Sequence, residues 1–424
     1  MNETRLYTAR HLLPILAPPV EDGALCVRGG RIVAAGRRDE VRRSSPGAAC
    51  TDFGEAILLP PMVNAHTHLE LTHFPEWAAE GGEEEPCTSF VDWILQVVRV
   101  KRRLDSGRYL TSLREGVRRS LRAGTGAVGD ILSWFPAREG FVGSPLRGRL
   151  FFETLGRDPE RTRRMLVGIE EELKGAPAGC LEPGISPHSP YTLSSEFLEE
   201  VIEFARRREV PLCTHLAESA EETRFLGEAE GPLAETFYPF VGWGDHVPSP
   251  SRLSPVAYLA ARGGLVPANL LVHGVQVAPE DVRRIADSGA GVVLCPRSNA
   301  RLGVGVAPID AYLSAGVPLA LGTDSLASCD SLSLWDELAF ARGWWQGRID
   351  PQRLLTMATA GGARALGLAS EMGALLPGSG AHFQVLRPPL LPAARELTEF
   401  LCTPGRTEEV AHLYLDGREV LLKD

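Results

Sequence analysis

The middle of this chain alternates strand-like and helix-like segments, and this alternation restricts its fold more than any other feature. Strands that are joined by crossover helices build a parallel sheet. Helical patterns occupy residues 110–123, 161–174, 195–208, 278–288 and 309–315. The predicted strands are 56–64, 127–131, 149–154, 181–186, 210–214, 270–272, 291–295 and 318–322. Eight such strands predict an α/β fold, a (β/α)8 TIM barrel, in which the chemistry lies at the C-terminal strand ends.

Both ends of the chain are β-rich. Residues 23–36 have the pattern of a hairpin with Gly29-Gly30 at its turn, and 381–386 and 412–420 have the pattern of strands. Because isolated hairpins are marginally stable, we expect the two ends to pair into one small β-sandwich. The predicted domains are therefore a discontinuous β-sandwich domain (1–58 and 373–424) and a catalytic barrel domain (59–372), with a helical tail at 350–366 between them.

Composition narrows the class of protein. The 424 residues carry a formal net charge of −10, which argues against a nucleic-acid or anionic-membrane partner. The eight cysteines include no CxxC pair, so neither structural zinc nor a disulfide framework is expected. The apolar stretch 12–20 contains three prolines and lacks the flanks of a signal peptide. We expect a soluble, cytoplasmic protein; a homodimer is compatible with the sequence, which does not determine the oligomeric state.

The first predicted barrel strand leads into two histidines. His66 and His68 are separated by one residue, and side chains at i and i+2 of a strand share a face. Two neutral imidazoles that converge at a strand end can ligate a metal ion. Taken alone, the pair could instead consist of two surface histidines on a loop, the less favoured interpretation.

The ends of other predicted strands supply further ligands. His215 follows the fifth strand, His273 the sixth and Asp324 the eighth. Three histidines and one aspartate suit a mononuclear site with one position open to water. A dinuclear site normally needs a bridging carboxylate, commonly a carboxylated lysine, and Lys101, Lys174 and Lys423 all lie away from the predicted strand ends. One divalent metal ion, Zn²⁺ or Fe²⁺, is therefore expected.

These motifs resemble those of the amidohydrolase superfamily over nearly the whole chain. Within it, three segments are similar to the branch of aromatic-amine deaminases and chlorohydrolases: 215–218 (HLAE), 295–299 (CPRSN) and 322–328 (GTDSLAS). The resemblance implies a hydrolytic deaminase in which His66, His68, His215 and Asp324 hold the metal. It also implies that Asp324 moves the proton of the attacking water, and that Glu218 protonates the ring nitrogen beside the attacked carbon. His273 would bond the water or the tetrahedral oxygen.

The same resemblance suggests where a nucleoside would bind. His188 looks like a substrate-contacting histidine of nucleoside deaminases, although it could merely cap a helix. Glu153, near the end of the third strand, is a candidate for a ribose contact. Ser298, with Asn299, either orients the substrate or turns the chain. Glu218 also has a simpler interpretation, as a first-turn glutamate that the helix dipole favours.

Longer segments bear on the substrate. Residues 64–70, 128–131, 151–153 and 185–190 resemble the aminodeoxyfutalosine deaminases of menaquinone biosynthesis, which act on 6-amino-6-deoxyfutalosine. The alternatives are a deaminase of adenosine, 5'-methylthioadenosine or S-adenosylhomocysteine, a more distant triazine-type chlorohydrolase, and, from another class, a metal-binding protein without catalytic activity. A purine nucleoside is the expected small-molecule partner.

Residues 70–110 form the longest insertion after a strand. The acidic run 80–86 has the pattern of a solvated turn, and the amphipathic stretch 90–98 predicts either a lid over the barrel or an ordinary packed helix. The futalosine skeleton carries a benzoate, which needs an apolar wall and a cation. Trp93 and Phe90 could supply that wall, and Arg157 could meet the carboxylate.

Overall fold

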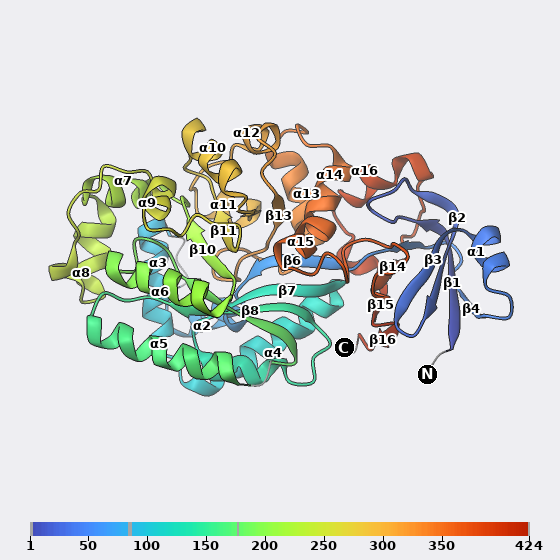
Figure 1. The fold of residues 1–424 in the computed structure, drawn as a ribbon, viewed down its shortest axis with the longest axis horizontal. Coiled ribbons are helices and arrows are strands. Elements are labelled where there is room, and N and C mark those ends of the chain that lie inside the picture. Colours follow the sequence, from blue (N-terminus) through green and yellow to red (C-terminus); the bar gives the residue numbers. More distant parts are fainter. Residues whose placement is uncertain (1–2, 84–86, 176–177, 423–424) are drawn as a thin grey trace.

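A parallel barrel forms the centre of the molecule (Figure 1). The computed structural model describes residues 3–83, 87–175 and 178–422. Eight strands pair in the order of the chain, which confirms the predicted fold class. They are β6 (Met62–Thr67), β7 (Thr125–Leu132), β8 (Arg147–Thr154), β9 (Cys180–Pro187), β10 (Leu212–Leu216), β11 (Asn269–His273), β12 (Val292–Leu294) and β13 (Leu319–Leu321). Apolar side chains such as Ile131, Phe151 and Val293 fill the interior of the barrel.

The first and last strands of the barrel, β6 and β13, meet at a seam beside the histidines that follow β6. A bridge pairs Thr67 with Asp324, and the Asp324 amide donates to the His66 carbonyl at 3.1 Å. The Asn64 side chain adds two hydrogen bonds across the seam, accepting from the Thr323 amide (3.1 Å) and donating to the Thr323 hydroxyl (2.7 Å). Gly322 is required here, because a Cβ atom would lie 2.8 Å from the His66 backbone oxygen.

Helices lie between and outside the barrel strands (Figure 1). Their starts follow ordinary capping chemistry: for example, the Ser194 hydroxyl accepts from the Phe197 amide and the Asp158 carboxylate from the Arg161 amide. The helices that follow the strands are α4 (Ser106–Arg122), α5 (Pro159–Lys174), α6 (Ser195–Arg208), α7 (Ala220–Glu228), α8 (Tyr238–Phe240), α9 (Pro255–Ala261), α10 (Pro279–Ser288), α11 (Pro296–Arg301), α12 (Ile309–Ser314), α13 (Leu334–Trp344), α14 (Pro351–Thr356) and α15 (Gly362–Ala365).

The two chain ends build a second, mixed sheet at one end of the molecule (Figure 1). Its strands are β1 (Thr4–Leu12), β2 (Val20–Arg28), β3 (Arg31–Arg37), β4 (Ala49–Asp52), β5 (Ile57–Leu59), β14 (Phe383–Leu386), β15 (Val410–Leu415) and β16 (Arg418–Val420), with α1 (Arg38–Ser44) and α16 (Leu397–Leu401) beside them. The strands form one hydrogen-bonded sheet. The rings of Tyr7 on β1 and Tyr414 on β15, which are not neighbouring strands, lie 5.3 Å apart. The sheet therefore folds over a core of its own, as predicted for paired chain ends.

The predicted first strand, 56–64, is in fact two strands of different sheets. β5 pairs with β1 and β14 in the terminal sheet, whereas β6 pairs with β7 in the barrel. Pro60-Pro61 separates them, since proline has no amide hydrogen to continue a ladder.

The insertion after β6 contains a short 3₁₀ turn (Leu69–Leu71), α2 (Phe74–Glu80) and α3 (Phe90–Lys101). Part of the predicted acidic turn, residues 84–86, lies outside the described residues. The apolar face of α3 packs into the main core through Phe90, Val91 and Ile94, and the Trp93 indole donates to the Ala327 carbonyl at 2.9 Å. The helix therefore covers the loop that follows β13; whether it moves as a lid stays a prediction.

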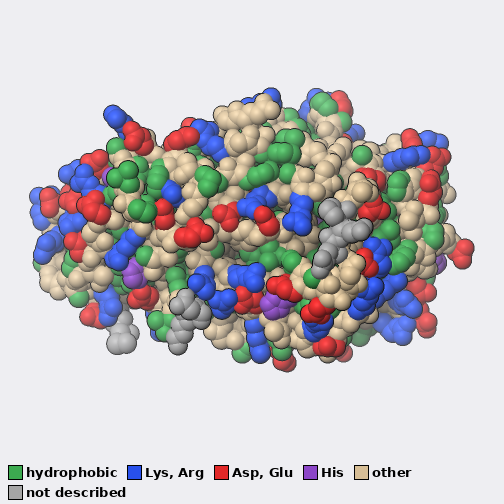
Figure 2. Space-filling model, turned by 180° about the vertical axis from the view of Figure 1, so that it is seen from behind, with side chains coloured by type: hydrophobic (Ala, Val, Ile, Leu, Met, Phe, Trp, Pro, Cys, Tyr) green, Lys and Arg blue, Asp and Glu red, His purple; other side chains and the backbone are tan. Residues whose placement is uncertain are grey.

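Three further properties of the chain bear on its class. In the described ranges, no helix has the length and apolarity needed to cross a membrane. Charged side chains of both signs are interspersed over the face seen in Figure 2, which shows no extended region of positive charge. All eight cysteines are free thiols.

Candidate metal centre

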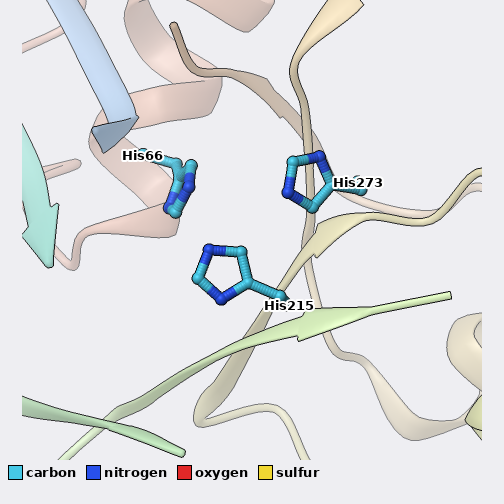
Figure 3. Close-up of side chains that lie close together, drawn as sticks. All are labelled: His66, His215 and His273. Atoms are coloured by element: carbon cyan, nitrogen blue, oxygen red, sulfur yellow. The ribbon is translucent and has the colours of Figure 1, made fainter. Parts of the chain in front are cut away.

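Histidines from three strand ends point toward one another (Figure 3). The ligand atoms of His66, His215 and His273 lie within 4.8 Å of one another, and so do those of His66, His68 and Asp324. The Nε2 atoms of His68 and His215 are 3.3 Å apart. The structure therefore brings together all four predicted metal ligands, with His273 beside them.

Asp324 completes this cluster from the loop after β13. Its Oδ1 lies 3.6 Å from His66 Nε2 and 3.7 Å from His68 Nε2. Its Oδ2 accepts hydrogen bonds from Ser298 (2.7 Å) and Ser328 (2.9 Å). These two hydroxyls orient the carboxylate and leave Oδ1 directed at the histidines.

The donor set fits a divalent cation. Both ring nitrogens of the fully buried His66 lack a hydrogen-bond partner among the described residues, an unfavourable arrangement that a metal ligand bond would relieve. His215 Nδ1 lies 2.8 Å from the His188 carbonyl, which fixes the ring and leaves Nε2 with a lone pair for the metal. Burial, followed by the charge of His66, lowers the pKa of His68 well below its usual value, so that its imidazole is neutral. Nitrogen and carboxylate donors of this kind suit Zn²⁺ or Fe²⁺.

Glu218 lies beside this cluster, at the turn between β10 and α7. Its Oε1 lies 3.4 Å from His273 Nε2, and the Glu222 carboxylate fixes its backbone amide at 2.8 Å. Burial, followed by the negative charge of Asp324, raises the pKa of Glu218 well above its usual value. The raised pKa favours the protonated carboxyl of Glu218, which can donate its proton to a bound substrate.

His273 is held by the helix after β12. Its Nδ1 lies 2.9 Å from the Asn299 side-chain oxygen, which leaves Nε2 facing the centre. His273 and Asp324 have φ angles of 75° and 61°, both in the left-handed region. Backbone conformations of this kind are costly for non-glycine residues and are found mostly where function requires them.

The other predicted substrate residues lie at the ends of β8 and β9. His188 is 4.8 Å from His215 between ring centroids, and its Nδ1 lies 3.0 Å from the Thr192 hydroxyl. The Glu153 side chain is buried. Burial raises its pKa to about 7, although the charge of Lys101 opposes the shift.

Lys101 is a functional candidate that the sequence did not reveal. It ends α3, far from any predicted strand end, but its Nζ lies 2.6 Å from the Ser133 hydroxyl and 3.8 Å from the buried Glu70 carboxylate. Both partners directly follow barrel strands, so the ammonium group lies among strand ends β6 and β7. Only the folded insertion brings it there. Lys423 is outside the described residues.

Arg157 is buried, and its Nε and Nη2 atoms lack a hydrogen-bond partner among the described residues. Its guanidinium lies over the Tyr238 ring at 4.9 Å and donates to the His246 carbonyl at 3.3 Å. Ser328 and Asn64 were also missed, although their spacing from Asp324 (i+4) and His66 (i−2) is a signal that could have found them.

Comparison with known proteins agrees with this geometry. Residues 57–420 match the amidohydrolase family. The chain is 35% identical over 382 residues to an aminodeoxyfutalosine deaminase of Deinococcus radiodurans, covering 86% of each chain. It is 30% identical over 422 residues to a 5-methylthioadenosine/S-adenosylhomocysteine deaminase of Halobacterium salinarum, covering 96% of this chain and 89% of the relative. The structure of Helicobacter pylori aminofutalosine deaminase with methylthio-coformycin superposes with a TM-score of 0.86 at 23% identity, over 98% of this chain and 100% of that one.

Proposed function

Since the chain belongs to the amidohydrolase family, we propose that it is a metal-dependent deaminase of adenine-type nucleosides that converts 6-amino-6-deoxyfutalosine to futalosine and ammonia. This reaction breaks a C–N bond that is not a peptide bond and would serve menaquinone biosynthesis. The observation that supports it best is the buried acid Glu218 next to His273 and Asp324, which combines a proton donor with a metal-ligand cluster.

His66, His68, His215 and Asp324 would hold the metal ion, Zn²⁺ or Fe²⁺. When bound, such an ion lowers the pKa of water toward neutrality and so supplies a nucleophile. Asp324 accepts the proton of the attacking water, because its carboxylate is ionised and faces the histidines. Although burial alone would raise the pKa of Asp324, its interaction with His66, whose Nε2 lies 3.6 Å from Oδ1, lowers this pKa well below its usual value.

Glu218 delivers its proton to the purine nitrogen beside the amino-bearing carbon, so that the ring carbon becomes more electrophilic. His273 hydrogen-bonds the oxygen that adds to this carbon, using the Nε2 that Asn299 leaves free. Asp324 then passes its proton to the amino group, and the C–N bond breaks to release ammonia. The hydroxyl proton of the adduct returns to Glu218, which leaves a carbonyl at the ring carbon and a proton on the ring nitrogen. Each proton thus moves between atoms that the strand ends hold within one buried cluster.

The sugar would extend toward β8 and β9. His188 contacts the nucleoside, and the Glu153 carboxylate accepts hydrogen bonds from the ribose hydroxyls. Trp93 forms an apolar wall above them, and Ser298 acts through Asp324. We further propose that the catalytic unit spans residues 59–372 and that 1–58 with 373–424 form the second domain.

A second candidate is a deaminase of 5'-methylthioadenosine or S-adenosylhomocysteine, which the 30% identity over nearly the whole chain favours. Ammonia release from a panel of adenine nucleosides by the metal-loaded enzyme distinguishes the two. We expect kcat/KM for aminodeoxyfutalosine to exceed that for adenosine at least about tenfold, roughly 1.4 kcal/mol of transition-state stabilisation. Equal or greater efficiency with adenosine or S-adenosylhomocysteine would overturn the substrate assignment but not the deaminase chemistry. Absence of ammonia release from every nucleoside would overturn both.

A further inference from the structure

A cavity of about 400 Å³ lies between the insertion after β6 and the loops that follow β12 and β13. Phe74 and Trp93 line it from the insertion, and Leu302, Leu326 and Ala327 line it from the two loops. Arg301, the last residue of α11, adds a guanidinium to this lining. We call this cavity the Arg301 pocket.

The Arg301 pocket is lined by residues that lie close in sequence to the catalytic centre. Leu326 and Ala327 follow Asp324 by two and three residues, and α11 also carries Ser298, which bonds Asp324. The indole of Trp93, which lines the pocket, donates a hydrogen bond to the Ala327 carbonyl at 2.9 Å.

Aromatic rings continue from this wall toward the proposed nucleoside site. The Phe90 ring lies 5.6 Å from that of Trp93 and 6.4 Å from that of Tyr191, whose ring is 6.2 Å from that of His188. A continuous line of aromatic contacts therefore links the wall of the Arg301 pocket to His188.

The charge of the pocket favours an anion. Arg301 forms no ion pair with any described residue, and its side chain has solvent access. Glu83, an acidic residue of the same lining, is already paired with Arg99 at 2.9 Å and Arg103 at 3.4 Å. A guanidinium can bind a carboxylate through two parallel hydrogen bonds, and the surrounding apolar walls favour a hydrophobic stem.

We propose that the Arg301 pocket binds the part of the substrate farthest from the purine, an apolar group that ends in a carboxylate, and that Arg301 is the carboxylate partner. The inference rests on the proposed function, because the benzoate of aminodeoxyfutalosine has this chemistry. We prefer Arg301 to Arg157 because Arg157 is buried against Tyr238 and donates to the His246 carbonyl, whereas the Arg301 side chain is exposed at the pocket. Adenosine and 5'-methylthioadenosine lack the carboxylate, so the pocket determines specificity rather than chemistry.

The test combines two substrates with two forms of the metal-loaded enzyme. Native protein and Arg301→Met are each assayed with aminodeoxyfutalosine and with its uncharged methyl ester. We expect native kcat/KM to favour the acid at least about tenfold, mainly through KM, because the contact is far from the reacting carbon. In Arg301→Met this ratio should fall to near one, while kcat/KM for 5'-methylthioadenosine stays unchanged.

Arg353→Met is the matched control, since it removes another exposed arginine and should preserve the ratio. Arg301→Gln, with thermal melting of each variant, separates a loss of folding from a loss of recognition. An unchanged acid-to-ester ratio in folded Arg301 variants would overturn the pocket but not the proposed function. If native enzyme prefers S-adenosylhomocysteine and the Arg301 variants lose that preference, the pocket is supported and the aminodeoxyfutalosine assignment is overturned. If native enzyme deaminates no carboxylate-bearing nucleoside, both proposals fail.

Discussion

Replacing Glu218 with glutamine should abolish most turnover and leave the metal bound. Glu218 lies 3.4 Å from His273 and outside both groups of clustered ligand atoms, so the metal does not depend on it. Its pKa is raised, first by burial, and this shift favours the protonated side chain. Glutamine has nearly the same shape and replaces this neutral acid without introducing or removing a charge, but it has no proton to donate.

The expected magnitude follows from this loss of proton transfer alone. General acid–base groups contribute on the order of 10² to 10⁴ in rate, which corresponds to about 3 to 5 kcal/mol of activation free energy. We expect Glu218→Gln to lower kcat by at least about 10². The metal content should equal that of native protein, and the melting temperature should change little, because the Glu218 backbone amide, not its side chain, bonds Glu222.

The assay pairs elemental analysis with ammonia release on the same protein sample. Glu221→Gln is the matched control, because it makes the same chemical change three residues after Glu218, in the first turn of α7 and outside the candidate site. Native activity in fully metallated Glu218→Gln would refute the role of proton donor. Loss of metal would instead identify Glu218 as a ligand.

Three other perturbations test separate parts of the site. Native protein should bind about one equivalent of divalent metal and His66→Ala should bind little; elemental analysis that finds two tightly bound ions, or none in fully active protein, contradicts this. Because burial raises the pKa of Glu153 to about 7, the side chain gains its negative charge as the pH rises through 7. The KM for nucleosides should therefore fall between pH 6 and 8, and this dependence should vanish in Glu153→Gln. The same KM profile in both proteins would exclude Glu153 as a ribose contact. Arg157→Met should lower the melting temperature, because it removes the contacts with Tyr238 and the His246 carbonyl, and should leave KM for aminodeoxyfutalosine unchanged; a large rise in KM without destabilisation would restore Arg157 as a carboxylate partner.

The sequence predicted the barrel because each strand and helix there has a local pattern. Residues 195–208 were predicted as a helix and form α6 over Ser195–Arg208, since capping by Ser194 and an apolar face both lie within the segment. The candidate metal ligands could also be predicted from the sequence, because residues that follow parallel strands converge at one end of a barrel. The break at Pro60-Pro61 was missed because the apolar run continues through it.

Other features depend on contacts between segments far apart in sequence. Lys101 reaches Ser133 only after the insertion folds onto the barrel, and Arg157 is held by Tyr238, which lies 81 residues later. Neither partner can be identified from local spacing. Ser298 was predicted as a substrate residue, but no pattern indicated that its hydroxyl bonds Asp324, 26 residues away.

The seam between β6 and β13 has a consequence for how the protein folds. Its hydrogen bonds join residues separated by 257 to 259 positions, so the chain must close a very long loop to form them. Closure of long loops carries a large entropic cost, and contacts of high sequence separation slow folding. The candidate ligands His66 and Asp324 lie on opposite sides of this seam. A ligand that binds only the native state raises its stability in proportion to RT ln(1 + [L]/Kd). An ion bound by ligands from both sides of the seam would therefore stabilise the closed barrel. The free energy of unfolding would then depend on the concentration of the metal ion.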